Sequence, residues 1–275
     1  MEIWIAILFG IVEGITEWLP ISSTGHMILL NEFIPLSMSD AFMEMFLVVI
    51  QLGAIMAVVL LFWKQIWPFT SQEKGWIKKD IFSMWFKILA ACIPAAILEL
   101  LFGDRLEELF YNYQTVSIML ITVGFLFIIV ENWNKGREAK IGSITEITYQ
   151  AAVIIGIFQL VAALLPGTSR SGATIIGGLV LGLSRTVAAE FTFYLAIPVM
   201  FGASLIKVLK FGMQYTASEV QVLVAGLLTA FVVSVIVIRF LMNFIRKHDF
   251  KVFGWYRIAL GVIVLGYFFI THNFG

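Results

Sequence analysis

Two short polar stretches lie inside otherwise apolar parts of this 275-residue chain, and their side chains are of the kinds that bind metal ions and phosphate. The first begins with Glu13 and Glu17 and ends with the run Ser22-Ser23-Thr24-Gly25-His26. The second runs from Pro166 to Thr174, with Arg170 near its middle. A carboxylate within a membrane segment costs ~2.5–3.5 kcal/mol and by default indicates a functional site.

Glu13 and Glu17 are four residues apart, so a helix places both carboxylates on one face. Two carboxylates repel each other unless a cation, a proton or a donor lies between them, and Mg²⁺ or Ca²⁺ takes carboxylate oxygens readily. We therefore expect Glu13 and Glu17 to bind a divalent cation. The alternative is that both lie near the outer surface as solvated or protonated side chains.

The run after Pro20 predicts the start of a new helix, where serine and threonine cap free N–H groups. A helix N-terminus also binds phosphate, and we expect Ser22, Thr24 and Gly25 to contact it. Ser23 is the first candidate for a nucleophile, with His26 one turn into the helix as its base and later acid. Direct attack by His26, or by water that it activates, stays open.

The second stretch predicts an anion-binding loop around Arg170, whose planar guanidinium suits phosphate. The residues expected to complete the loop with hydroxyls and N–H groups are Gly167, Thr168, Ser169, Ser171 and Thr174. The expected catalytic set is Glu17, Ser23, His26 and Arg170. The alternative for Arg170 is an ion pair with Glu13 or Glu17 that serves structure alone.

The two stretches are parts of a duplicated unit with a constant spacing of 146 residues. The identical pairs are Gly10 and Gly156, Ile11 and Ile157, Leu19 and Leu165, Pro20 and Pro166, Ser23 and Ser169, and Glu44 and Glu190. At this spacing Arg170 stands where the first copy has Thr24, and Gly172 where it has His26. The first copy then supplies metal ligands and base, and the second an anion clamp.

Composition indicates an all-α polytopic membrane protein, because 60% of the residues are hydrophobic and only 13% are charged. The formal net charge is zero, so nothing favours binding to nucleic acid. We expect one membrane domain, residues 1–275, with repeats of about 1–140 and 147–275. The expected spans are 42–63, 81–102, 115–133, 188–209, 218–241 and 255–272.

Two further apolar stretches, 3–30 and 148–183, are interrupted by the polar runs, and neither half is long enough to span a bilayer. We expect each to be a re-entrant helix–loop–helix, because irregular backbone at membrane depth must be buried in protein or line a wet cavity. Each repeat is then a re-entrant pair plus three transmembrane helices. Since three is odd, the copies have inverted topology, and their tips meet near the midplane.

Basic residues concentrate in three connections, which the positive-inside rule places in the cytoplasm. These are the loop 64–80 with Lys64, Lys74, Lys78 and Lys79, the loop 134–147, and the segment 239–251. Both termini are then expected outside. Arg185 and Arg257 lie near span ends and are expected to be interfacial, Arg257 by snorkelling.

The chain resembles the undecaprenyl-diphosphate phosphatases of the bacitracin-resistance type, over essentially its whole length. The resemblance is carried by Glu13-Gly-Ile-Thr-Glu-Trp-Leu-Pro-Ile-Ser-Ser-Thr-Gly-His26 and Pro166-Gly-Thr-Ser-Arg-Ser-Gly-Ala-Thr174. It implies a bacterial plasma-membrane enzyme whose site opens outward. The enzyme would hydrolyse a C55 polyprenyl diphosphate to the monophosphate carrier of cell-wall synthesis and inorganic phosphate. A divalent cation and resistance to bacitracin are implied as well.

Two other classes of function fit part of the pattern. Inverted repeats around an anion site also suit a lipid-phosphate flippase or an anion or proton carrier, although a carrier has no use for a nucleophile beside a base. A membrane scaffold would leave the buried charges unexplained. The sequence leaves the oligomeric state open, with a homodimer as one option.

Overall fold

The computed structural model describes residues 1–70, 76–212 and 215–274, and within these ranges the chain is helical throughout, without a named strand. Lys74, one of the basic loop residues, lies outside the described residues. The helices of the first half are α1 Glu2–Thr16, α2 Ser23–Phe33, α3 Asp40–Leu61, α4 Trp63–Ile66, α5 Lys79–Phe110 and α6 Tyr113–Asn134. A 3₁₀ turn, η1 Ile144–Glu146, leads to α7 Tyr149–Leu164, α8 Arg170–Val180, α9 Arg185–Phe211, α10 Ala217–Phe244 and α11 Lys251–Phe274.

The expectation of a helical polytopic membrane protein is confirmed. Six helices among the described residues are long and apolar enough to cross a bilayer. They cover 40–61, 79–103, 113–134, 185–211, 217–244 and 251–271, so each expected span is present with slightly different ends. Large apolar side chains face outward along these helices, for example Leu100, Leu205 and Ile236, as lipid contact requires.

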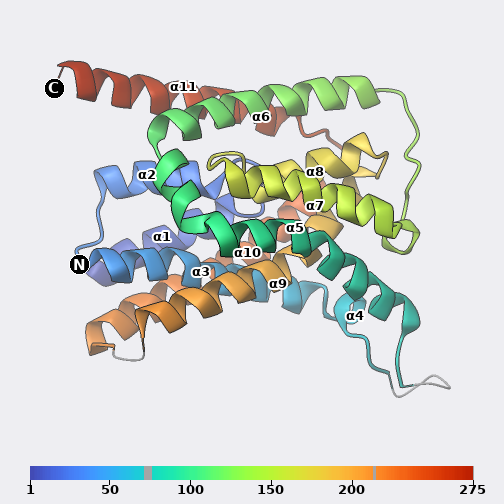
Figure 1. Ribbon diagram of the computed structural model, residues 1–275, viewed down its shortest axis with the longest axis horizontal. Coiled ribbons are helices and arrows are strands. Elements are labelled where there is room, and N and C mark those ends of the chain that lie inside the picture. Colours follow the sequence, from blue (N-terminus) through green and yellow to red (C-terminus); the bar gives the residue numbers. More distant parts are fainter. Residues whose placement is uncertain (71–75, 213–214, 275) are drawn as a thin grey trace.

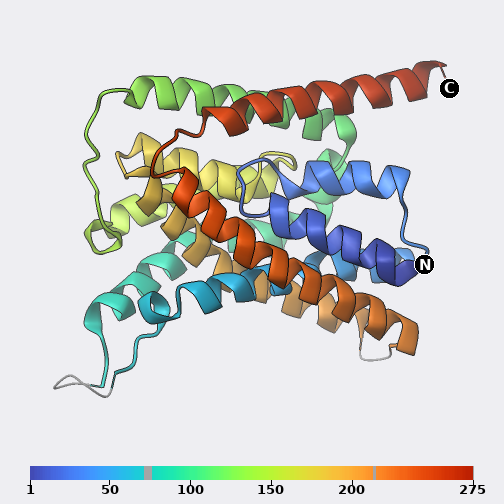
Figure 2. The same cartoon turned by 180° about the vertical axis from the view of Figure 1, so that it is seen from behind.

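Two helix–turn–helix pairs, α1–α2 and α7–α8, are too short to cross and lie among the long helices (Figure 1). The pair α1–α2 starts at the edge that holds both termini, whereas α7–α8 starts at the opposite edge. Figure 2 shows the same arrangement from behind. Their turns, residues 17–22 and 165–169, therefore approach each other from opposite sides in the interior of the bundle.

The two halves of the chain interlock through close helix contacts. Helix α1 packs on α10, and α7 packs on α5. The first helix of each short pair therefore contacts a long helix of the other half. A Cβ on Gly10 would lie 2.5 Å from the Gly226 carbonyl oxygen, and one on Gly156 would lie 2.3 Å from that of Ala91. Because lipid offers no hydrophobic drive for helix association, close backbone-to-backbone packing of this kind is one of the interactions that hold membrane helices together.

Gly53 is the tightest of these contacts, since an added Cβ would lie 2.1 Å from the Leu227 carbonyl oxygen of α10. We expect Gly53→Ala to separate α3 from α10 and to destabilise the protein by about 1–3 kcal/mol, as overpacking does. The measurement is thermal unfolding in detergent. Gly266→Ala is the matched control, because a Cβ there meets no described atom within 4 Å. Equal melting temperatures for both variants would contradict the packing described.

Candidate active site

The two turns share an unusual backbone feature at the residue that caps the returning helix. Ser22 and Ser169 are the only non-glycine residues with positive φ in the described part of the chain, at 74° and 68°. Each caps its helix, Ser22 by accepting from the Gly25 N–H at 3.4 Å and Ser169 from the Gly172 N–H at 3.2 Å. Backbone held in this region costs energy and is typical of functional sites.

This geometry corrects the pairing of the two copies at their tips. The caps Ser22 and Ser169 are 147 residues apart rather than 146, because the second turn has one more residue between its proline and its cap. Gly167, at φ 90°, lies in this longer turn. Arg170 is therefore the structural counterpart of Ser23, not of Thr24, and each is the first residue of its helix.

Both of these first residues bind the same carboxylate. Ser23 Oγ donates to Glu17 Oε2 at 2.9 Å, and Arg170 Nη2 donates to Glu17 Oε1 at 3.0 Å. Ser171 Oγ donates to the Glu17 carbonyl oxygen at 3.2 Å. Glu17 thus joins the two tips in a largely buried cluster. The expected proximity of Glu17, Ser23 and Arg170 is present, and so is the ion pair foreseen as the alternative for Arg170.

A second set of bonds orients Arg170. Its Nη1 donates to the Thr192 carbonyl oxygen of α9 at 2.9 Å. The Thr174 hydroxyl donates to the Arg170 carbonyl oxygen at 2.9 Å and lies 2.8 Å from the Thr192 hydroxyl. Thr174, which the sequence assigned to phosphate, therefore sits behind Arg170 and fixes the helix that carries it.

A small central cavity of about 190 Å³ lies between the tips. Of the expected site residues, those that line it are Glu17, Ser23, Thr24, Gly167, Ser169 and Arg170. Gln51 of α3 completes the wall and was not foreseen, because a lone glutamine in a span carries no distinct signal. Those that do not line it are Glu13, Ser22, Gly25, His26, Thr168, Ser171 and Thr174, all of them buried except the half-buried His26.

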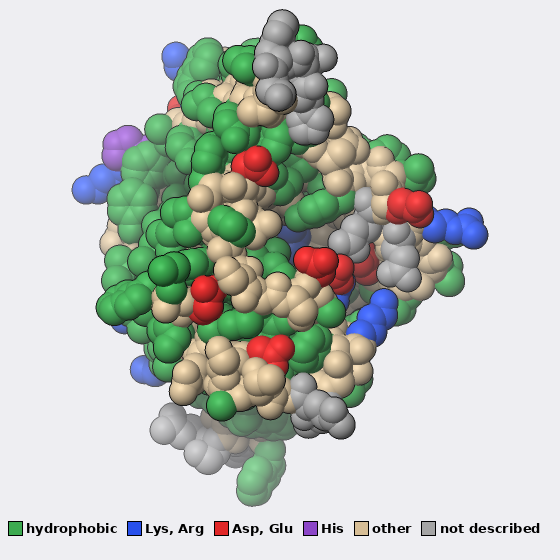
Figure 3. Space-filling view, turned by 90° about the vertical axis from the view of Figure 1, so that its left-hand side faces the viewer, with side chains coloured by type: hydrophobic (Ala, Val, Ile, Leu, Met, Phe, Trp, Pro, Cys, Tyr) green, Lys and Arg blue, Asp and Glu red, His purple; other side chains and the backbone are tan. Residues whose placement is uncertain are grey.

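A larger cavity of about 760 Å³ leads from the terminus-bearing face toward this centre. It shares Ser23, Thr24 and Gln51 with the central cavity. Figure 3 shows this face, hollowed near its middle and surrounded by acidic side chains. Those that line the cavity are Glu13, Glu32, Asp40, Glu44 and Glu99. The centre is thus open to water from one side.

Glu13 lies in the wall of this outer cavity, 1% exposed, and its Oε1 has no hydrogen-bond partner among the described residues. The described residues hold no group of three or more His, Cys, Asp or Glu side chains that could coordinate a metal. The expected pair of ligands, Glu13 and Glu17, would therefore need further oxygens from water or substrate, as Mg²⁺ sites commonly do.

The structure does not bring His26 to Ser23. The described hydrogen bonds of the His26 ring join Nδ1 to the Ser22 carbonyl oxygen and Nε2 to the Tyr256 hydroxyl, both at 2.7 Å. The ring stacks on Tyr256 of α11, at an interplanar angle of 4°. Among the described hydrogen bonds, the Ser23 hydroxyl donates to Glu17 and not to His26. The one-turn spacing from the cap directs the imidazole away from the cavity.

The sequence suggested an interfacial position for Arg257, and this prediction is wrong. The side chain is fully buried. Its guanidinium donates to the carbonyl oxygens of Pro20 at 3.2 Å, Gly167 at 2.7 Å and Thr168 at 2.9 Å. One side chain of α11 thus binds both turns. The signal was present, since an arginine within an apolar span is costly and indicates a role, but its position near the end of the span favoured snorkelling.

Arg185 also has a specific partner that the sequence did not indicate. It binds Glu131 through two nitrogens, at 2.9 Å and 2.6 Å, and Glu131 is 2% exposed. Glu131 further accepts from the Phe250 N–H at 2.9 Å. This cluster joins α6, α9 and the start of α11 at the edge away from the termini, so its role is structural.

Comparison with known proteins identifies the family to which this geometry belongs. Residues 6–263 match the family model described as bacitracin resistance protein BacA. The chain is 65% identical to an undecaprenyl-diphosphatase of Desulfitobacterium hafniense, over 98% of this chain and 96% of that one. It is 62% identical to undecaprenyl-diphosphatase 1 of Clostridium acetobutylicum, over 98% and 99%, and 58% identical to an undecaprenyl-diphosphatase of Enterococcus faecalis, over 96% of each. The chain therefore belongs to the BacA family of bacitracin resistance proteins.

Proposed function

We propose that this membrane protein hydrolyses undecaprenyl diphosphate to undecaprenyl phosphate and inorganic phosphate, which recycles the lipid carrier and confers resistance to bacitracin. Its family and the names of its close relatives support this activity. The observation that carries it is the cluster at the centre, where one carboxylate contacts a hydroxyl at 2.9 Å and a guanidinium at 3.0 Å beside a water-accessible cavity.

The cluster supports a two-step transfer. The Ser23 oxygen bonds to the terminal phosphorus while its proton passes to Glu17, and the bond from that phosphorus to the bridging oxygen breaks. Undecaprenyl phosphate leaves with the bridging oxygen and its electron pair. Water then attacks the phosphoserine. One of its protons goes to the Ser23 oxygen, the other stays on the released phosphate, and the Glu17 proton passes to solvent.

Arg170 and the turn around it bind the charge that develops on the transferred group. A guanidinium has five N–H donors, and the described bonds to Glu17 and Thr192 engage two of its terminal nitrogens. Thr24, Gly167 and Ser169 line the same cavity. Phosphoryl transfer depends mainly on positioning and electrostatics, which a rigid, partly dry site supplies.

Glu13 and Glu17 are the residues that would hold the divalent cation, Mg²⁺ or Ca²⁺. The fit is supported by the unpartnered Glu13 Oε1 and by the position of Glu13 one turn from Glu17. Two carboxylates plus phosphate and water oxygens form the usual donor set for Mg²⁺. When bound, the cation neutralises charge on the phosphate oxygens.

We also propose that the two halves form an inverted-topology repeat with re-entrant tips and an outward-facing site. Support comes from the same order of elements in both halves and the common cap geometry. The described parts of the basic connections, 64–70, 76–80, 134–147 and 239–251, lie largely at the edge opposite the termini (Figure 1). By the positive-inside rule that edge is cytoplasmic, so both termini and the outer cavity face outward.

The central test of the activity is phosphate release by the purified protein in detergent, where transport cannot occur. Arg170→Lys is expected to lower turnover at least 100-fold, because a point charge cannot bind a carboxylate and a phosphate as a planar fork does. Arg137→Lys, at an exposed site in the 134–147 loop, is the matched control. Chelation should stop release, and added Mg²⁺ or Ca²⁺ should restore it. Near-normal activity of Arg170→Lys would remove Arg170 from the site.

The identity of the nucleophile is tested by quenching during turnover, with acid in one sample, where phosphoserine survives, and with alkali in a parallel sample, where phosphohistidine survives. With substrate labelled in its terminal phosphate, we expect label on the peptide that contains Ser23 and none in Ser23→Ala, whose turnover falls at least 1,000-fold, an order of magnitude typical for a lost nucleophile. Label on His26 would instead make histidine the nucleophile. Substantial turnover by Ser23→Ala would indicate direct attack by water.

The orientation is tested with single cysteines in a Cys92→Ala background, labelled in intact cells by a membrane-impermeant maleimide. Ser37→Cys, near the termini, should be labelled from outside. Thr145→Cys, in the connection before α7, should react only after permeabilisation. The reverse labelling pattern would mean that the topology is inverted, with the outer cavity on the cytoplasmic face.

A further inference from the structure

A narrow groove of about 360 Å³ opens between α5, α7 and α9. Its lining is apolar except for Gln159, Arg170 and Glu99, and Glu99 also lines the edge of the outer cavity. The groove wall includes a group of small residues, namely Ala95, Ala96, Ala162, Ala163, Gly202 and Ala203. Ala96, Gly202 and Ala203 are exposed on the surface of helices that cross the membrane, so the groove is open to lipid.

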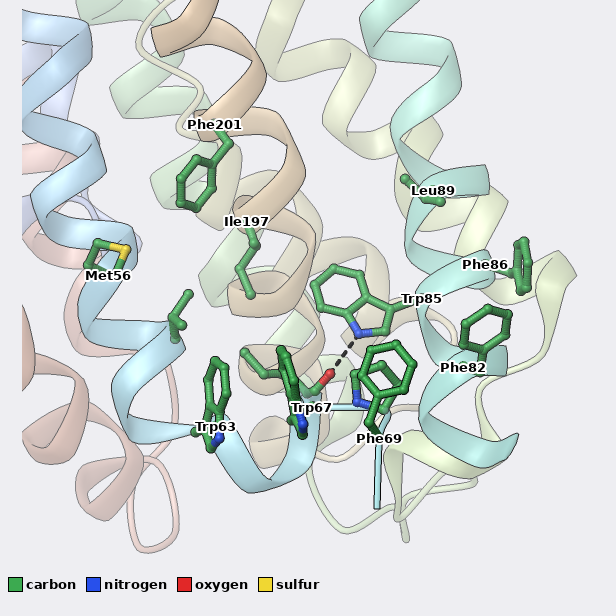
Figure 4. A pocket seen from close by; sticks show the side chains of 13 residues that line it. Met56, Trp63, Trp67, Phe69, Phe82, Trp85, Phe86, Leu89, Ile197 and Phe201 are labelled. Atoms are coloured by element: carbon green, nitrogen blue, oxygen red, sulfur yellow. Dashed lines mark hydrogen bonds between the residues drawn. The ribbon is translucent and has the colours of Figure 1, made fainter. Parts of the chain in front are cut away.

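The groove is continuous with the candidate active site. Arg170, Ala162, Val199 and Ala203 line both the groove and the central cavity. A molecule in the groove therefore has its inner end at the guanidinium that binds phosphate. No other apolar opening among the pockets described has this property. The apolar pocket of about 680 Å³ around Trp63, Trp67 and Trp85 (Figure 4) shares no residue with the central cavity.

Gln159 is the polar residue at the junction. It is 3% exposed and lines the groove, and neither its Nε2 nor its Oε1 has a hydrogen-bond partner among the described residues. Buried amides in folded proteins are normally paired. An unpaired amide beside Arg170 is suited to the first phosphate of a lipid diphosphate, the one attached to the tail.

Resting on the proposed function, we propose that this groove binds the first isoprene units of the substrate. The tail lies between α5 and α9, the phosphate attached to it meets Gln159 and Arg170, and the terminal phosphate faces Glu17 and Ser23. The outer cavity, whose lining includes five carboxylates and Lys207, serves as the route by which released phosphate reaches water. Hydrocarbon and released phosphate thus occupy two different cavities, which share Glu99 in their walls.

A pair of glycine substitutions tests the groove. A Cβ on Gly202 or on Gly266 would meet no described atom within 4 Å, and both lie in membrane-spanning helices, but only Gly202 lines the groove. For each variant, kcat/KM is measured with C55 diphosphate and with a five-carbon prenyl diphosphate. The ratio compared is kcat/KM for the C55 substrate divided by kcat/KM for the five-carbon substrate. We expect Gly202→Trp to lower this ratio at least tenfold, chiefly by raising KM for the long substrate. Gly266→Trp should leave it unchanged. An unchanged ratio in Gly202→Trp would overturn the proposal.

Photocrosslinking locates the tail without requiring turnover. A polyprenyl diphosphate with a diazirine in its second isoprene unit is expected to label peptides of α5 and α9, and Gly202→Trp should reduce that labelling while Gly266→Trp does not. Labelling confined to other helices would contradict the proposal that the tail binds in this groove. Labelling of α5 and α9 by a protein that releases no phosphate would keep the groove and reject the proposed hydrolysis.

Discussion

The carboxylate of Glu17 and the guanidinium of Arg170, which lie far apart in the sequence, form an ion pair at the centre of an apolar helix bundle. The helices and turns around them fix their positions. Glu17 and Arg170 lie 3.0 Å apart with little exposure to solvent. A buried charge that loses its partner is strongly destabilising, so each requires the other. Ser23 Oγ donates to the same carboxylate, so a hydroxyl, a carboxylate and a guanidinium lie together, and this is the arrangement on which the proposed phosphoryl transfer rests.

The surrounding backbone gives the cluster its rigidity. Ser22 and Ser169 hold strained conformations that direct two helix starts at the same carboxylate. Arg257 binds carbonyl oxygens of both turns, so the spacing between the tips is set by a third helix that takes no part in the cavity. Groups fixed in advance need little reorganisation as charge develops, which is how enzyme sites stabilise transition states.

The sequence predicted the parts of this arrangement that depend on composition and interruption. Continuous apolar runs define spans, and Pro20 and Pro166 mark the turns, so the meeting of Glu17 and Arg170 followed from topology. The sequence could not predict how each short helix is rotated about its own axis, and therefore which side chains face the cavity. One additional residue in the second turn makes Arg170 the counterpart of Ser23, and the direction in which His26 points depends on where its cap falls. Such details are set by backbone torsion, which spacing alone does not encode.

The separation of Glu17 and Arg170 by 153 residues bears on biogenesis. During synthesis the first helical pair enters the membrane well before its counter-charge exists. Throughout that interval the carboxylates must stay hydrated, take up protons or be shielded by the insertion machinery, because an ionised side chain in lipid is costly. Insertion of α8, which carries Arg170, therefore changes the electrostatics of the first half as well as adding a helix. It supplies the counter-charge, so the first half expressed alone would depend on hydration or protonation of Glu17 throughout.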